Sequence, residues 1–171
     1  MKKGYVQIYY GDGKGKTTAA IGIAIRSAAA NFKILFIQFL KRRKSGECKV
    51  LAKFDNIHFY CFGDKCFIKE PIKESIIKKY NKVFTKVKKL IKNNDFDLCI
   101  FDEILYLLKL KILKEREIIN LIKEKPMKTE YILTGNYKSK KLFEYADLIT
   151  EMKSIKHYYQ QKVKARKGIE Y

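Results

Sequence analysis

The sequence of 171 residues has no apolar run long enough to cross a bilayer. Its longest candidate, residues 19–30, is short and is interrupted by Arg26, whereas a spanning helix needs about 20 apolar residues. The first residues also lack the apolar core of a secretory signal peptide. We therefore expect a cytoplasmic protein that does not associate with membranes. The length suits one domain and no repeat or linker divides it, so we expect a single domain over residues 1–171.

Cysteine is sparse and lacks the spacing of a metal site. The chain has four cysteines, Cys48, Cys61, Cys66 and Cys99, without a C-x-x-C pair or a cysteine–histidine arrangement typical of zinc. In a reducing compartment we expect free thiols. Cys99 lies within an apolar segment and is expected in the core, whereas Cys61 and Cys66 can approach each other but need not.

Arginine is scarce although the chain is strongly basic. The net charge is +20, but only five of the 38 basic residues are arginine. Lysines that neutralise phosphates give non-specific affinity for nucleic acid, so the charge raises that question. The lysines are spread along the chain among many isoleucines, which is typical of a codon bias across a genome. We expect clusters such as 41–44 and 86–89 to be solvated faces that help attract anionic substrates, and we expect no nucleic-acid partner.

A glycine-rich segment, YGDGKGKTT at residues 10–18, lies between an apolar alternating stretch and a run of helix formers. Strand, glycine turn and helix in this order form a phosphate cradle, because the glycines let successive N–H groups converge on one anion and the helix dipole adds to the attraction. We expect Lys16 to reach the terminal phosphates and the Thr17 hydroxyl to bind Mg²⁺. The loop is a variant, since Tyr10 stands where the usual first glycine would be. A hairpin with incidental lysines is the alternative, which the strand-to-helix context disfavours.

Apolar stretches typical of strands alternate with segments of helical periodicity, which favours a parallel sheet with helices on both faces. Expected strands span residues 5–10, 34–39, 57–62, 98–101, 130–133 and 148–150, and expected helices span 16–30, 72–92, 114–123 and 139–145. Ligands bind such sheets at the carboxyl ends of the strands. We therefore expect two segments to border the site: 41–53, predicted as a mobile loop, and 63–70.

Two carboxylates, Asp102 and Glu103, follow the apolar stretch 98–101. Phosphate-loop proteins use such acids, on a neighbouring strand, to position Mg²⁺. We expect one acid to bind the ion directly or through water and the other to orient that water or the lysine; which acid touches the ion stays open. A plain strand end is the alternative, and the glycine loop favours the metal role. Residues 134–136 (Thr-Gly-Asn) either face the same crevice or form a tight turn.

With these features in view, the chain resembles the ATP:corrinoid adenosyltransferases almost from end to end. The resemblance rests on GDGKGKTTAA with Arg26 downstream, GDKCFIKEP around Phe67, LCIFDE, ILTGN and the terminal sequence from Ala146 to Tyr171. It implies an α/β fold of the RecA-like phosphate-loop NTPase type, a mostly parallel sheet with helices on both faces, and a homodimer. The ATP-binding candidates are then Gly11, Asp12, Gly13, Lys14, Gly15, Lys16, Thr17, Thr18 and Arg26, and the candidates for Mg²⁺ or Mn²⁺ are Thr17, Asp102 and Glu103.

The reaction that the resemblance implies moves the 5′-deoxyadenosyl group from ATP to a corrinoid, in adenosylcobalamin biosynthesis or salvage. Co(I), made from enzyme-bound Co(II) by an external donor such as a flavoprotein, attacks C5′ of ATP, and triphosphate leaves. Lys16, Lys14, Mg²⁺ and the loop amides would stabilise the charge that develops on the leaving group. Phe67 would lie beneath the corrinoid and help exclude its lower axial ligand, although an ordinary core position is the alternative. Lys16 and Phe67 are therefore the catalytic candidates.

The chain departs from the family pattern in three places. Gly4 nearly opens the first strand, where better-studied members carry an extension that covers the active site, so we expect the corrinoid to be held differently. Asn136 stands where the family commonly has arginine, a loss that Lys138 and Lys140 would compensate. The corrinoid-facing loop has one central aromatic residue, Phe67, where other members have two.

Two other functions stay open on the sequence alone. The first is a phosphate-loop ATPase or kinase acting on the γ-phosphate, which would need a water-orienting residue and often an arginine near that phosphate. The second is a nucleic-acid-binding module, for which charge is the main argument and whose plentiful tyrosines and phenylalanines would stack on bases.

Overall fold

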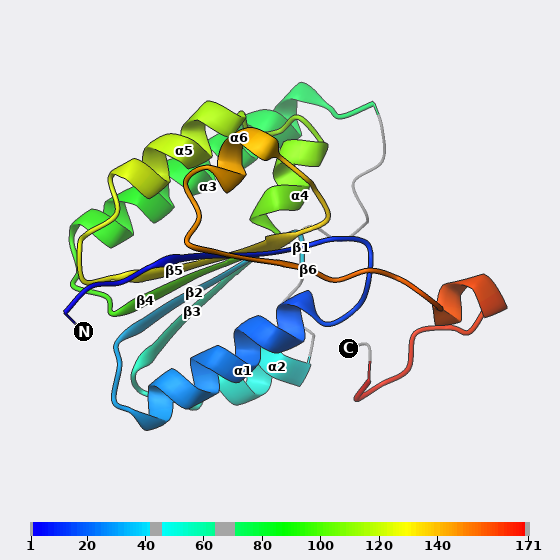
Figure 1. Cartoon of the computed structure of the whole chain (residues 1–171), viewed down its shortest axis with the longest axis horizontal. Helices are drawn as coiled ribbons and strands as arrows, with labels where there is room; N and C mark the ends of the chain where they lie inside the picture. The colour runs from blue at the N-terminus through cyan, green and yellow to red at the C-terminus, as the bar shows by residue number, and fades with distance from the viewer. Residues whose placement is uncertain (1, 42–45, 64–70, 170–171) are drawn as a thin grey trace.

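The computed structural model describes residues 2–41, 46–63 and 71–169, and a six-stranded sheet forms its centre (Figure 1). The strands are β1 (Val6–Tyr10), β2 (Ile34–Phe39), β3 (Ile57–Phe62), β4 (Leu98–Asp102), β5 (Glu130–Gly135) and β6 (Leu148–Glu151). Their order across the sheet is β3-β2-β4-β5-β1-β6, and every pairing is parallel. All the strands expected from the sequence are confirmed, with small differences at their ends.

Helices cover both faces of the sheet, so the expected α/β fold is confirmed. The helices are α1 (Lys16–Ala29), α2 (Gly46–Leu51), α3 (Glu74–Lys92), α4 (Ile104–Lys109), α5 (Glu115–Lys123) and α6 (Lys140–Phe143), followed by the short 3₁₀ helix η1 (Tyr158–Gln161). In Figure 1, α1 and α2 lie on one face and α3 to α6 on the other. This arrangement is consistent with a phosphate-loop NTPase fold. Among the described residues, no helix combines the length and apolar character that a membrane span requires.

The interior consists of two apolar layers, one on each face of the sheet. Alternate side chains of a strand point to opposite faces, so Leu35 and Ile37 pack in the layer with α3 to α5, while Ile34 and Phe36 pack in the layer with α1. The neighbouring strands β2 and β4 are buried throughout. The same alternation turns Gln38 and Asp102 toward the α1 face, where they stand opposite each other in register.

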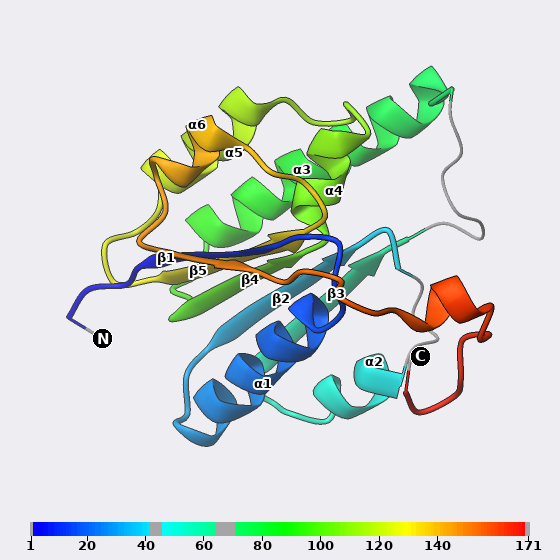
Figure 2. The same ribbon diagram turned by 45° about the vertical axis from the view of Figure 1, so that its right-hand side comes forward.

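Because every strand is parallel, all carboxyl ends meet at one edge of the sheet. The glycine loop after β1 and the acidic pair at the end of β4 both lie there. The acidic strand is not the direct neighbour that the sequence suggested, since β5 separates it from β1. Helix α1 brings the loop close to the end of β4, because the helix packs across both β4 and β5. The chain after β6 extends beyond the same edge, and its end returns toward α2 (Figure 2).

Candidate active site

The glycine loop takes its shape from the segment that follows β6. Gly11 and Gly15 have φ angles of 118° and 110°, which residues with a side chain rarely adopt. The backbone N–H of Gly13 donates to the Met152 carbonyl at 2.7 Å, and the N–H of Met152 donates to the Tyr10 carbonyl at 2.8 Å. A Cβ atom at Gly13 would lie 2.7 Å from that Met152 oxygen. Glycine is needed here because two backbones approach closely.

The charged side chains of the loop have different partners. Lys16 Nζ donates to the Gly13 carbonyl at 2.6 Å, and burial lowers the pKa of Lys16 although Glu103 and Asp12 act against that shift. Lys14 is exposed, with its Nζ 5.2 Å from the centre of the Tyr158 ring. Asp12 accepts a hydrogen bond from the Ser154 N–H at 3.1 Å. The Lys16 ammonium thus lies across the loop, where an anion would compensate for its lost hydration.

Asp102 is a fully buried carboxylate surrounded by donors. Thr134 Oγ1 donates to Asp102 Oδ1 at 2.6 Å, and Thr17 Oγ1 lies 3.0 Å from the same oxygen. On the other oxygen, Gln38 Nε2 donates at 3.1 Å and Lys41 Nζ lies 3.8 Å away. A buried carboxylate is tolerated only when paired and hydrogen-bonded, and these donors satisfy that condition.

Glu103 follows directly and occupies a strained position. Its φ angle is 64°, in the left-handed region that costs a residue with a side chain free energy, and its N–H donates to Thr134 Oγ1 at 2.9 Å. Burial, followed by repulsion from Asp102, raises the pKa of Glu103, while Lys41 and Lys16 partly oppose the rise. A cation near both carboxylates would relieve this repulsion.

Thr17, Asp102 and Glu103 are the residues at this site that could hold a metal ion. The described part of the chain contains no group of three or more histidine, cysteine or acidic side chains arranged to hold an ion. Mg²⁺ is commonly held by one or two carboxylates together with substrate phosphates and water. Thr17, Asp102 and Glu103 supply that partial set at the edge of the loop.

A cavity of about 480 Å³ opens over the loop, a volume within the usual range for small-molecule sites. Its lining consists of residues 13–18, Ile21, Lys41, Gly46, Glu47 and Glu103, together with Gly168 and Ile169 from the end of the chain. A second cavity of about 420 Å³ lies beside it, between the loop and residues 153–161. The two cavities share Gly13 and Lys14.

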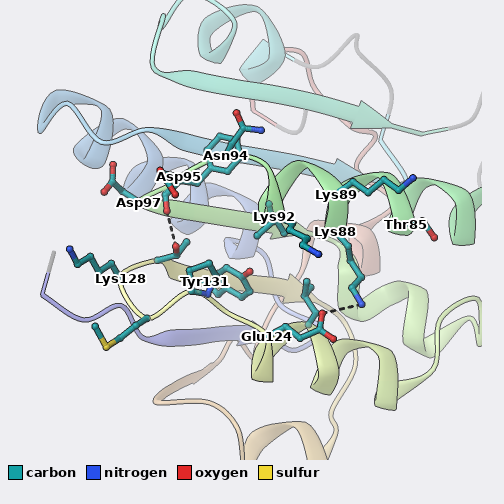
Figure 3. Close-up of a pocket in the computed structure, with 16 residues that line it drawn as sticks. Thr85, Lys88, Lys89, Lys92, Asn94, Asp95, Asp97, Glu124, Lys128 and Tyr131 are labelled. Atoms are coloured by element: carbon teal, nitrogen blue, oxygen red, sulfur yellow. Dashed lines mark hydrogen bonds and ion pairs between the residues drawn. The ribbon is translucent and has the colours of Figure 1, made fainter.

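A larger cavity, of about 1240 Å³, lies at the opposite edge of the sheet, near the amino ends of β4 and β5 (Figure 3). Lys88 on α3 and Glu124 after α5 form an ion pair of 3.1 Å beside it. Its lining includes four lysines and three acidic residues. The loop and the acidic pair are absent from its lining, so size alone does not identify the candidate site.

The structure brings most of the predicted residues to one place. Residues 13–18 and Glu103 line the cavity, and Asp102 contacts Thr17. Arg26 does not reach the loop: it lies exposed in the last turn of α1, about 15 Å along the helix axis from Lys16. We therefore leave Arg26 out of the site. Phe67 and Cys66 lie outside the described residues.

Several residues at the site were missed or misread from the sequence. Lys41, expected on a solvated face, contacts Asp102 and Thr17. Glu47 lies in the first turn of α2, within a segment that was expected to be a mobile loop, and Gln38 was not singled out. The available signal for Gln38 was that it is the only polar residue in the otherwise apolar strand ILFIQF. Thr134, left open between crevice and turn, contacts Asp102.

Comparison with known proteins agrees with this geometry. Residues 2–171 match the family model described as ATP:corrinoid adenosyltransferase BtuR/CobO/CobP. A corrinoid adenosyltransferase of a Sinorhizobium species is 32% identical over 174 residues, covering 99% of this chain and 81% of the relative. The corrinoid adenosyltransferase of Escherichia coli strain K12 is 27% identical over 170 residues, covering 99% and 87%. That of Pseudomonas aeruginosa is 26% identical over 172 residues, covering 99% and 85%.

The family match extends over nearly the whole chain and includes the glycine loop, the acidic pair and the terminal segment that shapes the loop. The chain belongs to the ATP:corrinoid adenosyltransferase family and is a corrinoid adenosyltransferase.

Proposed function

We propose that this chain transfers the 5′-deoxyadenosyl group of ATP to the cobalt of a reduced Co(I) corrinoid and releases triphosphate, in adenosylcobalamin biosynthesis or salvage. The observation that carries the proposal is the meeting of Lys16, Thr17 and Asp102 beside one cavity of nucleotide size, in a chain that belongs to this family. Membership of this family supports ATP and a corrinoid as the two substrates.

The reaction requires little proton transfer. The electron pair of Co(I) forms the bond to C5′ as the bond from C5′ to the triphosphate oxygen breaks, and that second pair leaves with the triphosphate. The protein must therefore align the two substrates and stabilise negative charge on the leaving group. The loop N–H groups and Lys16 are suited to this task, and Lys14 is close enough to the same cavity to assist. Binding of the polyphosphate would restore the pKa that burial lowers at Lys16.

Thr17, Asp102 and Glu103 would hold the Mg²⁺ or Mn²⁺ ion that accompanies ATP. When bound, the ion would neutralise phosphate charge and relieve the repulsion between the two acids. Lys41 supports the same arrangement, because its Nζ lies 3.8 Å from Asp102 Oδ2 and 3.5 Å from Glu47 Oε1. These residues would fix the ion on the side of the loop where α1 begins.

The proposal for the corrinoid side starts from Phe67, which would lie beneath the ring and help exclude the lower axial ligand. An external electron donor such as a flavoprotein would supply the electron that reduces Co(II) to Co(I). We further propose that residues 1–171 act as one domain and assemble as a homodimer. The edge strand β6 supports self-association because its apolar side chains Leu148 and Ile149 are exposed.

Product analysis tests the proposed function. Purified protein incubated with ATP, Mg²⁺ and chemically reduced Co(I) cobalamin is expected to yield a light-sensitive adenosylated corrinoid and triphosphate in equal amounts. Omission of ATP and replacement of Co(I) by Co(II) without reductant are the controls. Formation of ADP and phosphate without corrinoid alkylation would contradict the proposal.

A further inference from the structure

A buried polar cluster adjoins Asp102 on β2. Gln38 is fully buried and pairs with Asp102 in the register of β2 and β4. Its amide nitrogen donates to Asp102 Oδ2 at 3.1 Å and to Glu47 Oε1 at 3.2 Å. One amide group therefore joins the Asp102 carboxylate at the end of β4 to the Glu47 carboxylate in the first turn of α2.

Two thiols face the other end of the same amide. Cys48 Sγ donates to Gln38 Oε1 at 3.7 Å, and Cys61 Sγ lies 3.8 Å from that oxygen. Carboxylates only accept hydrogen bonds and thiols can donate them. The amide nitrogen must then face Asp102 and Glu47, and the amide oxygen must face the sulfurs, so the surrounding groups fix which way the amide points.

Cys61 also connects to the cation of the cluster. Its thiol donates to the Lys41 carbonyl at 2.6 Å, while Lys41 Nζ donates to Thr17 Oγ1 at 3.3 Å and lies 3.8 Å from Asp102 Oδ2. The Lys41 backbone also lies close to Gly63, where a Cβ atom would overlap the Lys41 carbonyl. The two thiols thus support both donors that contact Asp102 Oδ2.

We propose that Gln38 is a positioning residue of the nucleotide site: it holds the Asp102 and Glu47 carboxylates in place. The Cys48 thiol, which donates to the Gln38 amide oxygen, holds Gln38 in the required orientation, and the Cys61 thiol holds the Lys41 backbone. This inference rests on the proposed function, in which Asp102 faces the metal ion that accompanies ATP. Without Gln38, Asp102 Oδ2 loses a buried donor and its carboxylate can turn away from Thr17. Groups that orient metal-binding side chains in this way typically change metal affinity by about 10–100-fold when removed.

Binding of Mn²⁺ tests the inference without turnover. We would titrate Mn²⁺ into protein with ATP in the absence of corrinoid and measure the free ion by electron paramagnetic resonance. Gln38→Met, which keeps the length of the side chain but lacks the amide, is expected to weaken Mn²⁺ binding by about 10–100-fold. Cys48→Ala is expected to cause a smaller loss in the same direction. Cys99→Ala is the matched control, because Cys99 packs in the apolar layer on the opposite face of the sheet and should leave the affinity unchanged.

The dependence of activity on metal concentration is a second measurement, and it separates a positioning role of Gln38 from a purely structural one. In Gln38→Met, adenosyl transfer lost at low metal concentration is expected to return at saturating Mn²⁺. Equal Mn²⁺ affinity in wild type, Gln38→Met and Cys48→Ala would overturn this inference alone. If Gln38→Met does not fold, Cys48→Ala decides, and an unchanged affinity in that variant overturns the inference. Failure of the wild-type protein to bind Mn²⁺ with ATP would overturn the proposed site together with the inference.

Discussion

At the scale of single residues, removal of the Lys16 side chain should lower the reaction rate without affecting the stability of the fold. It is half-buried and its one described side-chain hydrogen bond is to the Gly13 carbonyl. Lys16→Ala is expected to lower the rate of adenosyl transfer by about 10²–10³-fold, the usual effect of losing one donor to a developing negative charge. The unfolding temperature should change little. Lys82→Ala, at an exposed position on α3, is the control, and full activity in Lys16→Ala would contradict the phosphate-binding role.

Glu103 should make stability depend on pH in a particular direction. Its pKa is raised in the folded protein by burial and by Asp102, so its ionisation as pH rises is less favourable in the folded than in the unfolded chain. The folded state therefore loses stability as pH rises from the usual glutamate range through the raised pKa. Glu103→Gln removes this loss. In protein free of nucleotide and metal, the variant is expected to unfold on the order of a few degrees higher than wild type at pH 7.

Thermal unfolding of both proteins between about pH 4 and 8 measures this effect, because the curves should meet near the low end, where the carboxyl is protonated in both states. Curves that run parallel over the whole interval would show that Glu103 does not titrate in this way.

Local sequence predicted the residues whose role follows from spacing. Lys16 and Thr17 follow the glycines, and Asp102 ends an apolar stretch, so the motif alone indicated them. Gln38, Lys41 and the cysteines could not be assigned in this way, because their contacts depend on the register of β2 with β4 and on where α2 places Glu47 and Cys48. Arg26 shows the converse case: it lies close in sequence, yet the rise of α1 carries it away from the loop.

At the scale of elements, the strands and long helices were predictable because their patterns extend over many residues. Helix α3, with 19 residues, repeats its apolar face several times. Helices α2 and α4 have only 6 residues each, too few to display a helical period, and both were missed. These two short helices are held by their surroundings instead. In α2, Cys48 and Leu51 are buried, and α4 starts directly after Glu103, which is its N-cap residue.

Replacement by alanine should change the stability of the protein in opposite directions at two glycines, Gly13 in the loop and Gly22 in the helix α1 that follows it. A Cβ atom at Gly22 in α1 meets nothing within 4 Å, so Gly22→Ala is expected to stabilise the protein by about 0.5–1 kcal/mol. A Cβ atom at Gly13 would lie 2.7 Å from the Met152 carbonyl and 2.8 Å from the Lys153 backbone, so Gly13→Ala should destabilise it. Denaturant unfolding measures both, and shifts of the same sign would contradict the close approach seen at Gly13.

At the scale of the whole molecule, the charge balance should oppose folding at low ionic strength. The chain carries 38 lysines and arginines against 18 acidic residues, and a large net charge destabilises a compact state through self-repulsion. Raising NaCl from about 0.01 to 0.15 M shortens the screening length from about 30 to 8 Å. The unfolding temperature is therefore expected to rise with salt. An uncharged osmolyte at equal osmolality is the control, and a temperature that falls or stays constant with NaCl would contradict the expectation.

The pairing of the loop with Met152 also bears on how the protein is made. Residues 10–18 leave the ribosome early, but the backbone that shapes them is translated more than 100 residues later. A domain generally folds as a unit during synthesis, and here the nucleotide loop must wait for a backbone partner near the other end of the chain. ATP therefore cannot guide folding of the nascent polypeptide until residue 152 has been added.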